Sequence, residues 1–159
     1  MRSQVQVLSP RPDFICYNKY IFMSETSVFT KIRQGEVPGE IIYQDERVFV
    51  IMTIAPHNPG HCLVIPVDEI GNFEEVPEGL YLHIMKVAQQ LARIQRKVYR
   101  SPKVAMIAAG MEVEHAHIHL FPLYSESDIA FTNAKHPDFS EVQAEGHKLK
   151  AAIEESPII

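Results

Sequence analysis

The sequence predicts an α+β domain in which an antiparallel sheet packs against one long helix. Three observations predict this class. Short stretches rich in β-branched and aromatic residues recur along the chain, one long segment repeats its apolar residues at helical spacing, and the strand-like stretches lie before and after that segment. A chain of 159 residues with 46% hydrophobic content is long enough for one domain with a sizeable core.

The two ends of the chain differ from its middle. Residues 1–13 carry two prolines and show no clear periodicity. We expect residues 1–23 to form a poorly packed N-terminal extension and residues 24–124 to form the main domain. Residues 125–159 are polar and form a C-terminal tail, in which we expect a helix over residues 140–155 with Ser140 as its cap.

The first elements of the main domain are a short helix and a hairpin. Ser27 suits the N-cap of a helix over residues 28–34, which Gly35 ends. Residues 40–44 and 47–54 are rich in β-branched and aromatic side chains, with a turn-like Asp-Glu pair between them. This pattern predicts two strands joined as a hairpin.

A loop, a strand and the long helix follow. Residues 55–60 include two prolines, an asparagine and a glycine and predict a loop, and residues 61–66 predict the next strand. Residues 77–100 predict the helix, because Pro77 suits a first turn and apolar residues recur at helical spacing. The expected core stripe consists of Leu80, Ile84, Val87, Leu91, Ile94 and Val98.

Two further strands are expected after the helix. Ser101 and Pro102 should stop the helix, because a proline disfavours the α conformation of the residue before it. Residues 104–109 and 114–121 have strand-like composition, and residues 110–112 predict a turn between them. Two strands joined so closely are expected to be antiparallel.

Charge and cysteine usage argue against several functional classes. The net charge of −5 argues against a nucleic-acid polymer as partner. The two cysteines, Cys16 and Cys62, lack metal-type spacing and predict no disulfide framework, which favours a reducing, cytoplasmic location. No apolar run approaches the length of a membrane span and no secretory leader is evident, so we expect no membrane partner.

Three histidines alternate with small or apolar residues in the segment Val-Glu-His-Ala-His-Ile-His-Leu-Phe-Pro. Because successive side chains of a strand point to opposite faces, His115, His117 and His119 would share one face, while Ala116 and Ile118 share the other. The spacing alone leaves three interpretations open. These are a metal site, a nucleophilic histidine whose neighbours stabilise charge, and histidines that each serve the structure alone.

The histidine segment resembles the signature of the histidine triad (HIT) family, and three further segments resemble that family in the right order. They read Ser27-Val-Phe-Thr-Lys-Ile-Arg-Gln-Gly-Glu-Val-Pro, Ile42-Tyr-Gln-Asp-Glu-Arg-Val-Phe-Val and Ala55-Pro-His-Asn-Pro-Gly-His-Cys-Leu-Val-Ile-Pro. The resemblance covers about residues 26–124. It implies a HIT-like α+β fold, with an antiparallel five-stranded sheet, one long helix and a short N-terminal helix. It also implies a homodimer that uses the long helix and neighbouring strands.

The resemblance further implies a hydrolase or transferase that binds a purine nucleotide and cleaves it at the α-phosphorus through a covalent nucleotidyl-histidine, without a cofactor. His117 would be the nucleophile, with its other ring nitrogen bound to a backbone carbonyl near His115. His119 would contact the non-bridging phosphate oxygens. His115 and His61 would support the nucleophile. A phosphoramidate substrate is favoured over a dinucleoside polyphosphate.

Substrate-binding residues are implied in the same way. Thr53 stands where many relatives carry an acidic residue that binds the ribose hydroxyls, and a threonine can serve only one of them. Glu112 is either a solvated turn residue or the acid that protonates the leaving group. The apolar slot for the base would be formed by Val28, Phe29, Ile32 and Ile51.

Several positions depart from the family pattern. The segment that begins at Ile107 reads Ile-Ala-Ala-Gly and lacks the usual asparagine, and Met111 stands where a glutamine is frequent. These losses predict slow turnover and leave open a second class, a nucleotide-binding or interaction protein with weak or lost catalysis. Ser27 and Thr30 replace the cysteines of a structural zinc site, so no metal is expected. His57 matches no family position, and we expect an exposed loop residue there.

Overall fold

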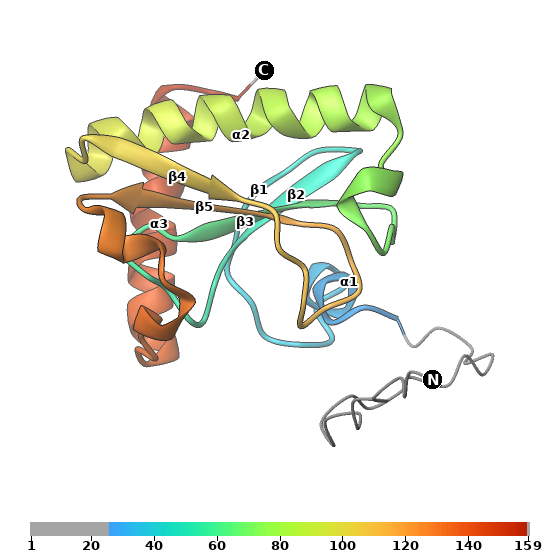
Figure 1. The fold of residues 1–159 in the computed structure, drawn as a ribbon, viewed down its shortest axis with the longest axis horizontal. Helices are drawn as coiled ribbons and strands as arrows, with labels where there is room; N and C mark the ends of the chain where they lie inside the picture. The colour runs from blue at the N-terminus through green and yellow to red at the C-terminus, as the bar shows by residue number, and fades with distance from the viewer. Residues whose placement is uncertain (1–25, 159) are drawn as a thin grey trace, which may run out of the picture.

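Five strands form one antiparallel sheet in the computed structural model, which describes residues 26–158 (Figure 1). They are β1 (Ile41–Gln44), β2 (Val48–Met52), β3 (Cys62–Pro66), β4 (Lys103–Ile107) and β5 (Ile118–Leu123). Their order is β1-β2-β3-β5-β4, and every neighbouring pair is antiparallel. The expected α+β class with a five-stranded sheet is confirmed. The extension expected at residues 1–23 lies outside the described residues.

Helices cover both faces of this sheet. The long helix α2 (Glu78–Tyr99) lies along one face, and the short helix α1 (Val28–Arg33) lies on the opposite face (Figure 1). The C-terminal helix α3 (Phe139–Glu155) packs on β1 and on α2. The described part of the chain also contains three short 3₁₀ turns, namely η1 (Phe73–Glu75), η2 (Glu126–Ile129) and η3 (Phe131–Asn133). Among the described helices, none is long and apolar enough to cross a membrane.

The helix ends follow from local chemistry. The side chain of Ser27 accepts a hydrogen bond from the backbone N–H of Phe29, so the expected N-cap of α1 is confirmed. Gly35 follows α1 with φ of 79°. The expected cap of α3 is wrong: Asp138 rather than Ser140 caps it, because Asp138 and the side chain of Glu141 form a reciprocal capping box.

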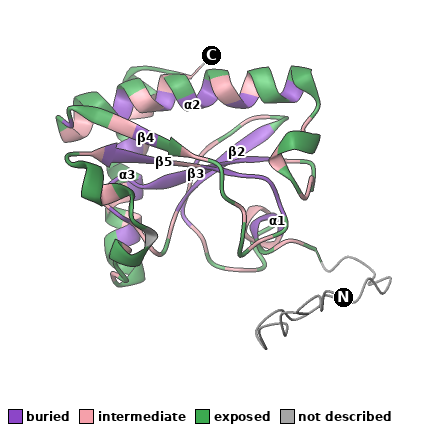
Figure 2. Ribbon diagram, in the orientation of Figure 1, coloured by how far each residue is buried: buried purple, intermediate pink, exposed green. Residues whose placement is uncertain are grey.

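Two cores lie on the two faces of the sheet. β2 and β3 are buried along their whole length, as Figure 2 shows in purple, so their alternate side chains fill both cores. Five of the six residues of the expected helical stripe are buried against one face, and Val98 packs beside them. The core on the α1 face contains Phe29, Phe49, Ile51, Leu63 and Ile65.

The register of the strand pairing places His119 on the same face of the sheet as the core beside α1. One row across four strands contains Ile51, Leu63, His119 and Ile107. Because directly paired residues of antiparallel strands share a face, His119 lies on the α1 face of the sheet.

The link between β4 and β5 is longer than expected. β4 ends at Ile107 and β5 begins only at Ile118, so the tight turn expected at residues 110–112 is wrong. The segment before β5 bonds elsewhere instead of pairing with β4. The N–H of Ala116 donates to the carbonyl of Ile70 at 2.6 Å, and the ring of His115 bonds to the carbonyl of Pro66. His115 and His117 therefore precede the strand, and only His119 lies within it.

Candidate active site

Four histidines gather on the α1 face, where β3 and β5 lie side by side. The ring centroids of His117 and His119 are 4.9 Å apart, and those of His61 and His119 are 5.3 Å apart. Phe29 of α1 places its ring 5.0 Å from that of His117 and 5.8 Å from that of His115. The structure thus brings together the four histidines and one residue of the expected base slot.

One ring nitrogen of His117 is engaged in a hydrogen bond to the backbone. Its Nδ1 lies 2.8 Å from the carbonyl oxygen of His115, and since a carbonyl only accepts, Nδ1 carries the proton. The neutral ring therefore has its lone pair on Nε2. Burial lowers the pKa of His117, and the bond to His115 together with the charge of Glu112 offsets part of this effect. A neutral imidazole with a lone pair on one nitrogen can act as a nucleophile.

His115 anchors this arrangement and is fully buried. Its Nε2 donates to the carbonyl of Pro66 at 2.9 Å, and its Nδ1 accepts from Oγ of Ser27 at 2.9 Å. Ser27 also caps α1, so one hydroxyl connects that helix to the histidine segment. Burial lowers the pKa of His115, which keeps the ring neutral and the pattern of bonds intact.

A chain of hydrogen bonds also sets the tautomers of His61 and His119. The backbone N–H of His57 donates to Nδ1 of His61 at 3.1 Å, so neutral His61 carries its proton on Nε2. That nitrogen lies 3.1 Å from Nδ1 of His119 and donates to it. His119 then carries its own proton on Nε2, where it can serve as a donor.

Both of these rings stay neutral at ordinary pH. Burial, with the neighbouring His119 and His57, lowers the pKa of His61 to about 2. Burial, with the neighbouring His117 and His57, lowers the pKa of His119 to about 4. The cluster is therefore uncharged, and it can offer donors and lone pairs in defined places.

The hydrogen bonds argue against a metal centre built on this cluster. A histidine binds a metal ion through an unprotonated nitrogen. In His115 and His61 the unprotonated nitrogen already accepts a hydrogen bond, from Ser27 and from the backbone of His57 respectively. Across residues 26–158, no group of three or more histidine, cysteine or acidic side chains is placed to hold an ion.

The expected base-slot residues are only partly brought together. Phe29, Ile32 and Ile51 belong to the core on the α1 face, beside the histidines. Val28 lies outside that core and is 41% exposed. Thr53 follows the end of β2 and is partly buried, and its hydroxyl oxygen accepts from the N–H of Ala55 at 3.2 Å.

Two residues of the loop before the histidines face solvent. Glu112 is exposed, and Met111 is 93% exposed. The charge of Glu112 nevertheless acts on His117, as described above.

The expectation of an exposed His57 is wrong. This side chain is only 4% exposed, its ring stacks on Phe121 at 4.7 Å, and its Nδ1 donates to the carbonyl of Asp128 at 2.8 Å. The cause is that the chain after β5 folds back over the loop before β3. No local pattern in the sequence reports a contact between residues this far apart in the chain.

Gln95 is a second residue that the sequence analysis missed. It is fully buried in α2, and its side-chain amide donates to the carbonyls of Gly60 at 2.8 Å and Leu120 at 3.2 Å. A signal was present, because Gln95 follows Leu91 by four residues and so continues the buried face of the helix with a polar side chain.

Comparisons with known proteins point to one family. The family model described as HIT domain matches residues 34–126, more than half of the chain. An uncharacterised HIT-like protein of Methanocaldococcus jannaschii is 33% identical over 125 residues, which are 74% of this chain and 96% of that protein. The purine nucleoside phosphoramidase of Escherichia coli K12 is 33% identical over 105 residues, 62% of this chain and 87% of that enzyme. A zinc-bound histidine triad family protein from Mycobacterium smegmatis has a TM-score of 0.71 at 26% identity, covering 82% of this chain and 94% of that one.

Proposed function

The chain belongs to the HIT domain family, and from this membership we propose that it is a nucleotide hydrolase or transferase. The proposed reaction cleaves a purine nucleoside 5′-phosphate derivative at the α-phosphorus, with a phosphoramidate preferred over a dinucleoside polyphosphate. The similarity to a purine nucleoside phosphoramidase supports this substrate class. The observation that carries the proposal is the bond from Nδ1 of His117 to the carbonyl of His115, which leaves the lone pair on Nε2.

The proposed mechanism has two displacements at phosphorus. Nε2 of His117 attacks, the N–P bond forms, and the bond to the leaving group breaks while that group takes a proton from water. The Nε2–H of His119 donates to a non-bridging oxygen, where negative charge develops. A water molecule then attacks the phosphorus, the N–P bond breaks, and a nucleoside monophosphate and one proton are released. His115 and His61 hold the two reacting rings in place.

Substrate recognition is proposed to use the apolar core beside Phe29. The base would lie against Phe29, Ile32 and Ile51, with Val28 at the exposed rim. The hydroxyl of Thr53 already accepts from Ala55, so it would donate its single proton to one ribose hydroxyl. Glu112 is exposed, and the two roles open to it are those of a solvated loop residue and of the acid that protonates the leaving group in place of water.

An assay with two substrates tests the proposal. The protein is incubated with adenosine 5′-phosphoramidate and separately with a diadenosine polyphosphate, and the release of AMP is measured. We expect turnover of the phosphoramidate by the wild type, trapping of a nucleotidyl adduct on His117 by mass spectrometry after rapid quenching, and a loss of on the order of 10³-fold or more in His117→Ala.

A matched control is available on the exposed face of α3. His147→Ala changes the same residue type in a position far from β5 in the chain and should retain full turnover. Equal turnover by His117→Ala and the wild type would contradict the proposed mechanism.

A second candidate function has one observation in its favour. Met111 is 93% exposed in the loop before the histidines, where a polar side chain could otherwise serve the phosphate. This favours a nucleotide-binding protein with weak or lost catalysis. Tight binding of AMP by calorimetry, together with no AMP release from either substrate, is the result that would select it.

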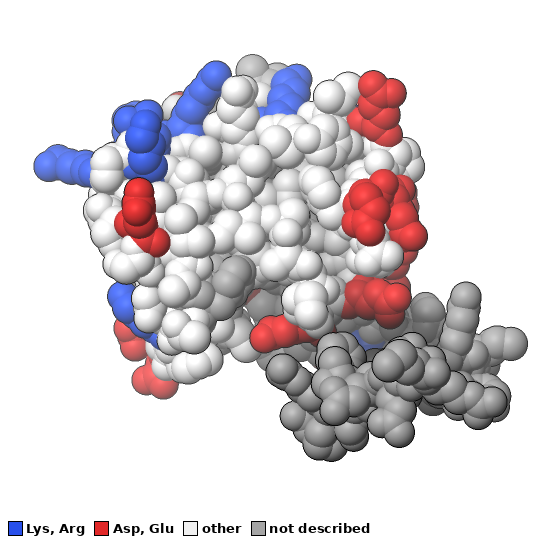
Figure 3. Space-filling view, viewed as in Figure 1, with Lys and Arg blue, Asp and Glu red and all other residues white. Residues whose placement is uncertain are grey.

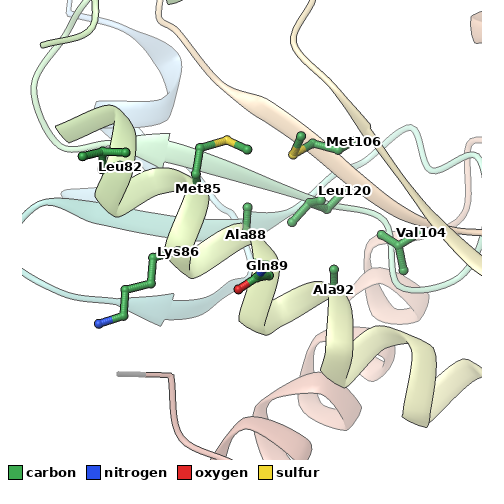
Figure 4. A pocket seen from close by; sticks show the side chains of 9 residues that line it. All are labelled: Leu82, Met85, Lys86, Ala88, Gln89, Ala92, Val104, Met106 and Leu120. Atoms are coloured by element: carbon green, nitrogen blue, oxygen red, sulfur yellow. The ribbon is translucent and has the colours of Figure 1, made fainter. Parts of the chain in front are cut away.

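We further propose that the protein forms a homodimer through α2 and β4. β4 is an edge strand of the sheet, and a hollow of about 470 Å³ lies between it and α2. Figure 4 shows apolar side chains around this hollow, among them Leu82 (58% exposed) and Met106 (50% exposed). An unpaired edge strand beside exposed apolar side chains is suited to pairing with a second chain.

Charge at the two ends of α2 supports the same assembly. Figure 3 shows basic side chains gathered toward one end of this view, where acidic atoms also lie, and acidic side chains gathered toward the other end. Glu78 lies in the first turn of α2, and Arg96 and Lys97 lie in its last turn. A two-fold, antiparallel pairing would place the basic end of one copy against the acidic end of the other.

A cytoplasmic location is proposed from the sequence alone.

A further inference from the structure

The loop before β3 is tied to the turn that follows β5. Nδ1 of His57 donates to the carbonyl of Asp128 at 2.8 Å, and the side-chain amide of Asn58 donates to the carboxylate of Asp128 at 3.1 Å. The same amide donates to the carbonyl of Pro122 at 2.9 Å. The N–H of Lys135 donates to the carbonyl of Pro56 at 2.9 Å. Three consecutive loop residues are therefore held by the chain that leaves β5.

The turn that binds the loop is itself held by hydrogen bonds. The carboxylate of Asp128 accepts from the backbone N–H groups of Tyr124 at 2.8 Å and Ser125 at 3.0 Å. The ring of His57 bonds to this turn through Nδ1 and stacks on Phe121 with an interplanar angle of 16°. The position of His57 is thus set by a hydrogen bond at the ring and by packing on its face.

This position matters because the backbone N–H of His57 selects the tautomer of His61. Neutral imidazole can carry its proton on either nitrogen. If the proton of His61 moved to Nδ1, its Nε2 would have to accept from His119, which would then be protonated on Nδ1. His119 would then have no proton on Nε2 for a phosphoryl oxygen. The donor from the loop excludes this second arrangement.

We propose that His57 is a positioning residue for the phosphoryl site: its ring, bound to the turn at Asp128, holds the loop so that the His57 backbone N–H keeps the donor proton of His119 on Nε2. The effect on turnover rests on the proposed function. The effect on the tautomers of His61 and His119 does not depend on it.

The test uses the full chain labelled with ¹⁵N in its histidine rings. NMR spectra give the ¹⁵N chemical shifts of the ring nitrogens of His61 and His119, which report the tautomer of each ring. They are measured for the wild type, His57→Phe and His57→Asn. Phenylalanine keeps the stacking on Phe121 but has no donor for Asp128, whereas the amide of asparagine can reach the carbonyl as Nδ1 does. We expect His57→Phe to show mixed tautomers at both rings, and His57→Asn to restore the wild-type shifts.

Kinetics provide the second readout. In His57→Phe we expect kcat for the phosphoramidate to fall about tenfold or more, because a donor to the developing charge is lost in part of the molecules. KM should change less than roughly twofold, because Phe29 and Ile51 are not touched. A general loss of structure would not produce this split, nor would His57→Asn reverse it.

A second variant loosens the turn from the surface. Asp128→Ala removes the carboxylate that binds Tyr124, Ser125 and Asn58, and should shift the tautomers in the same direction by a smaller amount. If His57→Phe does not fold, the Asp128→Ala variant alone tests whether the loop sets the tautomers of His61 and His119. Asp138→Ala is the matched control, because Asp138 caps α3 and makes no contact with the loop among the described hydrogen bonds.

The outcomes are separable. The proposal is overturned if the ring ¹⁵N chemical shifts of His61 and His119 stay unchanged in His57→Phe. If His57→Phe does not fold, unchanged chemical shifts in Asp128→Ala overturn it. The same holds if Asp138→Ala alters these shifts as much as Asp128→Ala. A wild type without turnover would count against the proposed function, while the ring shifts would still decide the role of His57.

Discussion

The side-chain amide of Gln95 donates to the backbone carbonyl of Gly60 at 2.8 Å, so the long helix holds the residue that directly precedes His61. The same amide donates to the carbonyl of Leu120, the residue that directly follows His119. One buried side chain of α2 thus bridges the backbone just before His61, which precedes β3, and the backbone of β5 just after His119. The helix and the histidines lie on opposite faces of the sheet, yet they are connected through these two carbonyls.

Replacing this amide should affect both stability and turnover. Gln95→Leu keeps a side chain of similar size but leaves the carbonyls of Gly60 and Leu120 without this donor, which should lower the free energy of unfolding by about 1–3 kcal/mol. We expect kcat to fall as well, because His61 and His119 lose their common restraint. Urea unfolding and the AMP-release assay measure the two effects. Gln143→Leu on α3 is the control, and a Gln95→Leu variant as stable and as active as this control would refute the role.

Gly60 itself should resist substitution more than another glycine of similar backbone conformation. Gly60 has φ of 85° and Gly35 has φ of 79°, so alanine strains both, by about 1 kcal/mol. A Cβ on Gly60 would in addition overlap the ring of Tyr99, whereas a Cβ on Gly35 meets open space. We expect Gly60→Ala to lower the melting temperature clearly more than Gly35→Ala. Similar losses in a thermal scan would show that Tyr99 moves aside without cost.

Acid should destabilise the protein through its neutral histidines. The unfolded chain protonates His61 near its ordinary pKa of 6.5, whereas the folded chain holds that pKa at about 2. Below pH 6.5 the unfolded state therefore binds more protons than the folded state. The free energy of unfolding that is present above pH 6.5 is lost as the pH falls, by up to about 1.4 kcal/mol per pH unit for this group.

The variant His61→Gln isolates this contribution. Its amide can donate to His119 as Nε2 does but takes up no proton, so its unfolding free energy should fall less steeply between about pH 6.5 and about pH 5. His147→Gln changes an exposed histidine and should follow the wild-type curve. Parallel curves for His61→Gln and the wild type would rule out this source of acid sensitivity.

The charge of Glu112 should be visible in the pH dependence of turnover. Because this negative charge raises the pKa of His117, Glu112→Gln should lower that pKa and shift the acid limb of kcat/KM to lower pH, by less than about half a unit at an exposed site. Glu114→Gln, an exposed carboxylate in the same loop, should shift the limb less. An acid limb that moves to higher pH in Glu112→Gln would contradict the assignment.

The proposed dimer predicts a difference between two exposed methionines. Met106→Lys places a charge in the hollow between β4 and α2 and should convert the protein to a monomer. Met111→Lys makes the same change in the loop, outside that hollow, and should leave the assembly unchanged. Sedimentation analysis of both variants measures the mass. A monomeric wild type, or a dimeric Met106→Lys, would argue against this surface.

Elements whose pattern is local could be predicted from the sequence. The stripe from Leu80 to Ile94 repeats at helical spacing, and Ser27 has the chemistry of an N-cap, so α2 and the start of α1 were predictable within a residue or two. The start of β5 was not, because alternation of histidine with apolar residues is typical of a strand whether or not the backbone is paired. Ala116 bonds to Ile70 instead, which is a contact between distant parts of the chain.

The amino-acid sequence by itself determined the α+β class, the family resemblance and the identity of the histidines, since each is written in residue types at short spacing. Only the tertiary structure decided which ring nitrogen carries each proton, and that His57 is buried. Those properties depend on the carbonyls of His115 and Asp128 and on the backbone N–H of His57, groups that almost any sequence can supply. Backbone groups leave no trace in residue identity, so their positions emerge only when the chain has folded.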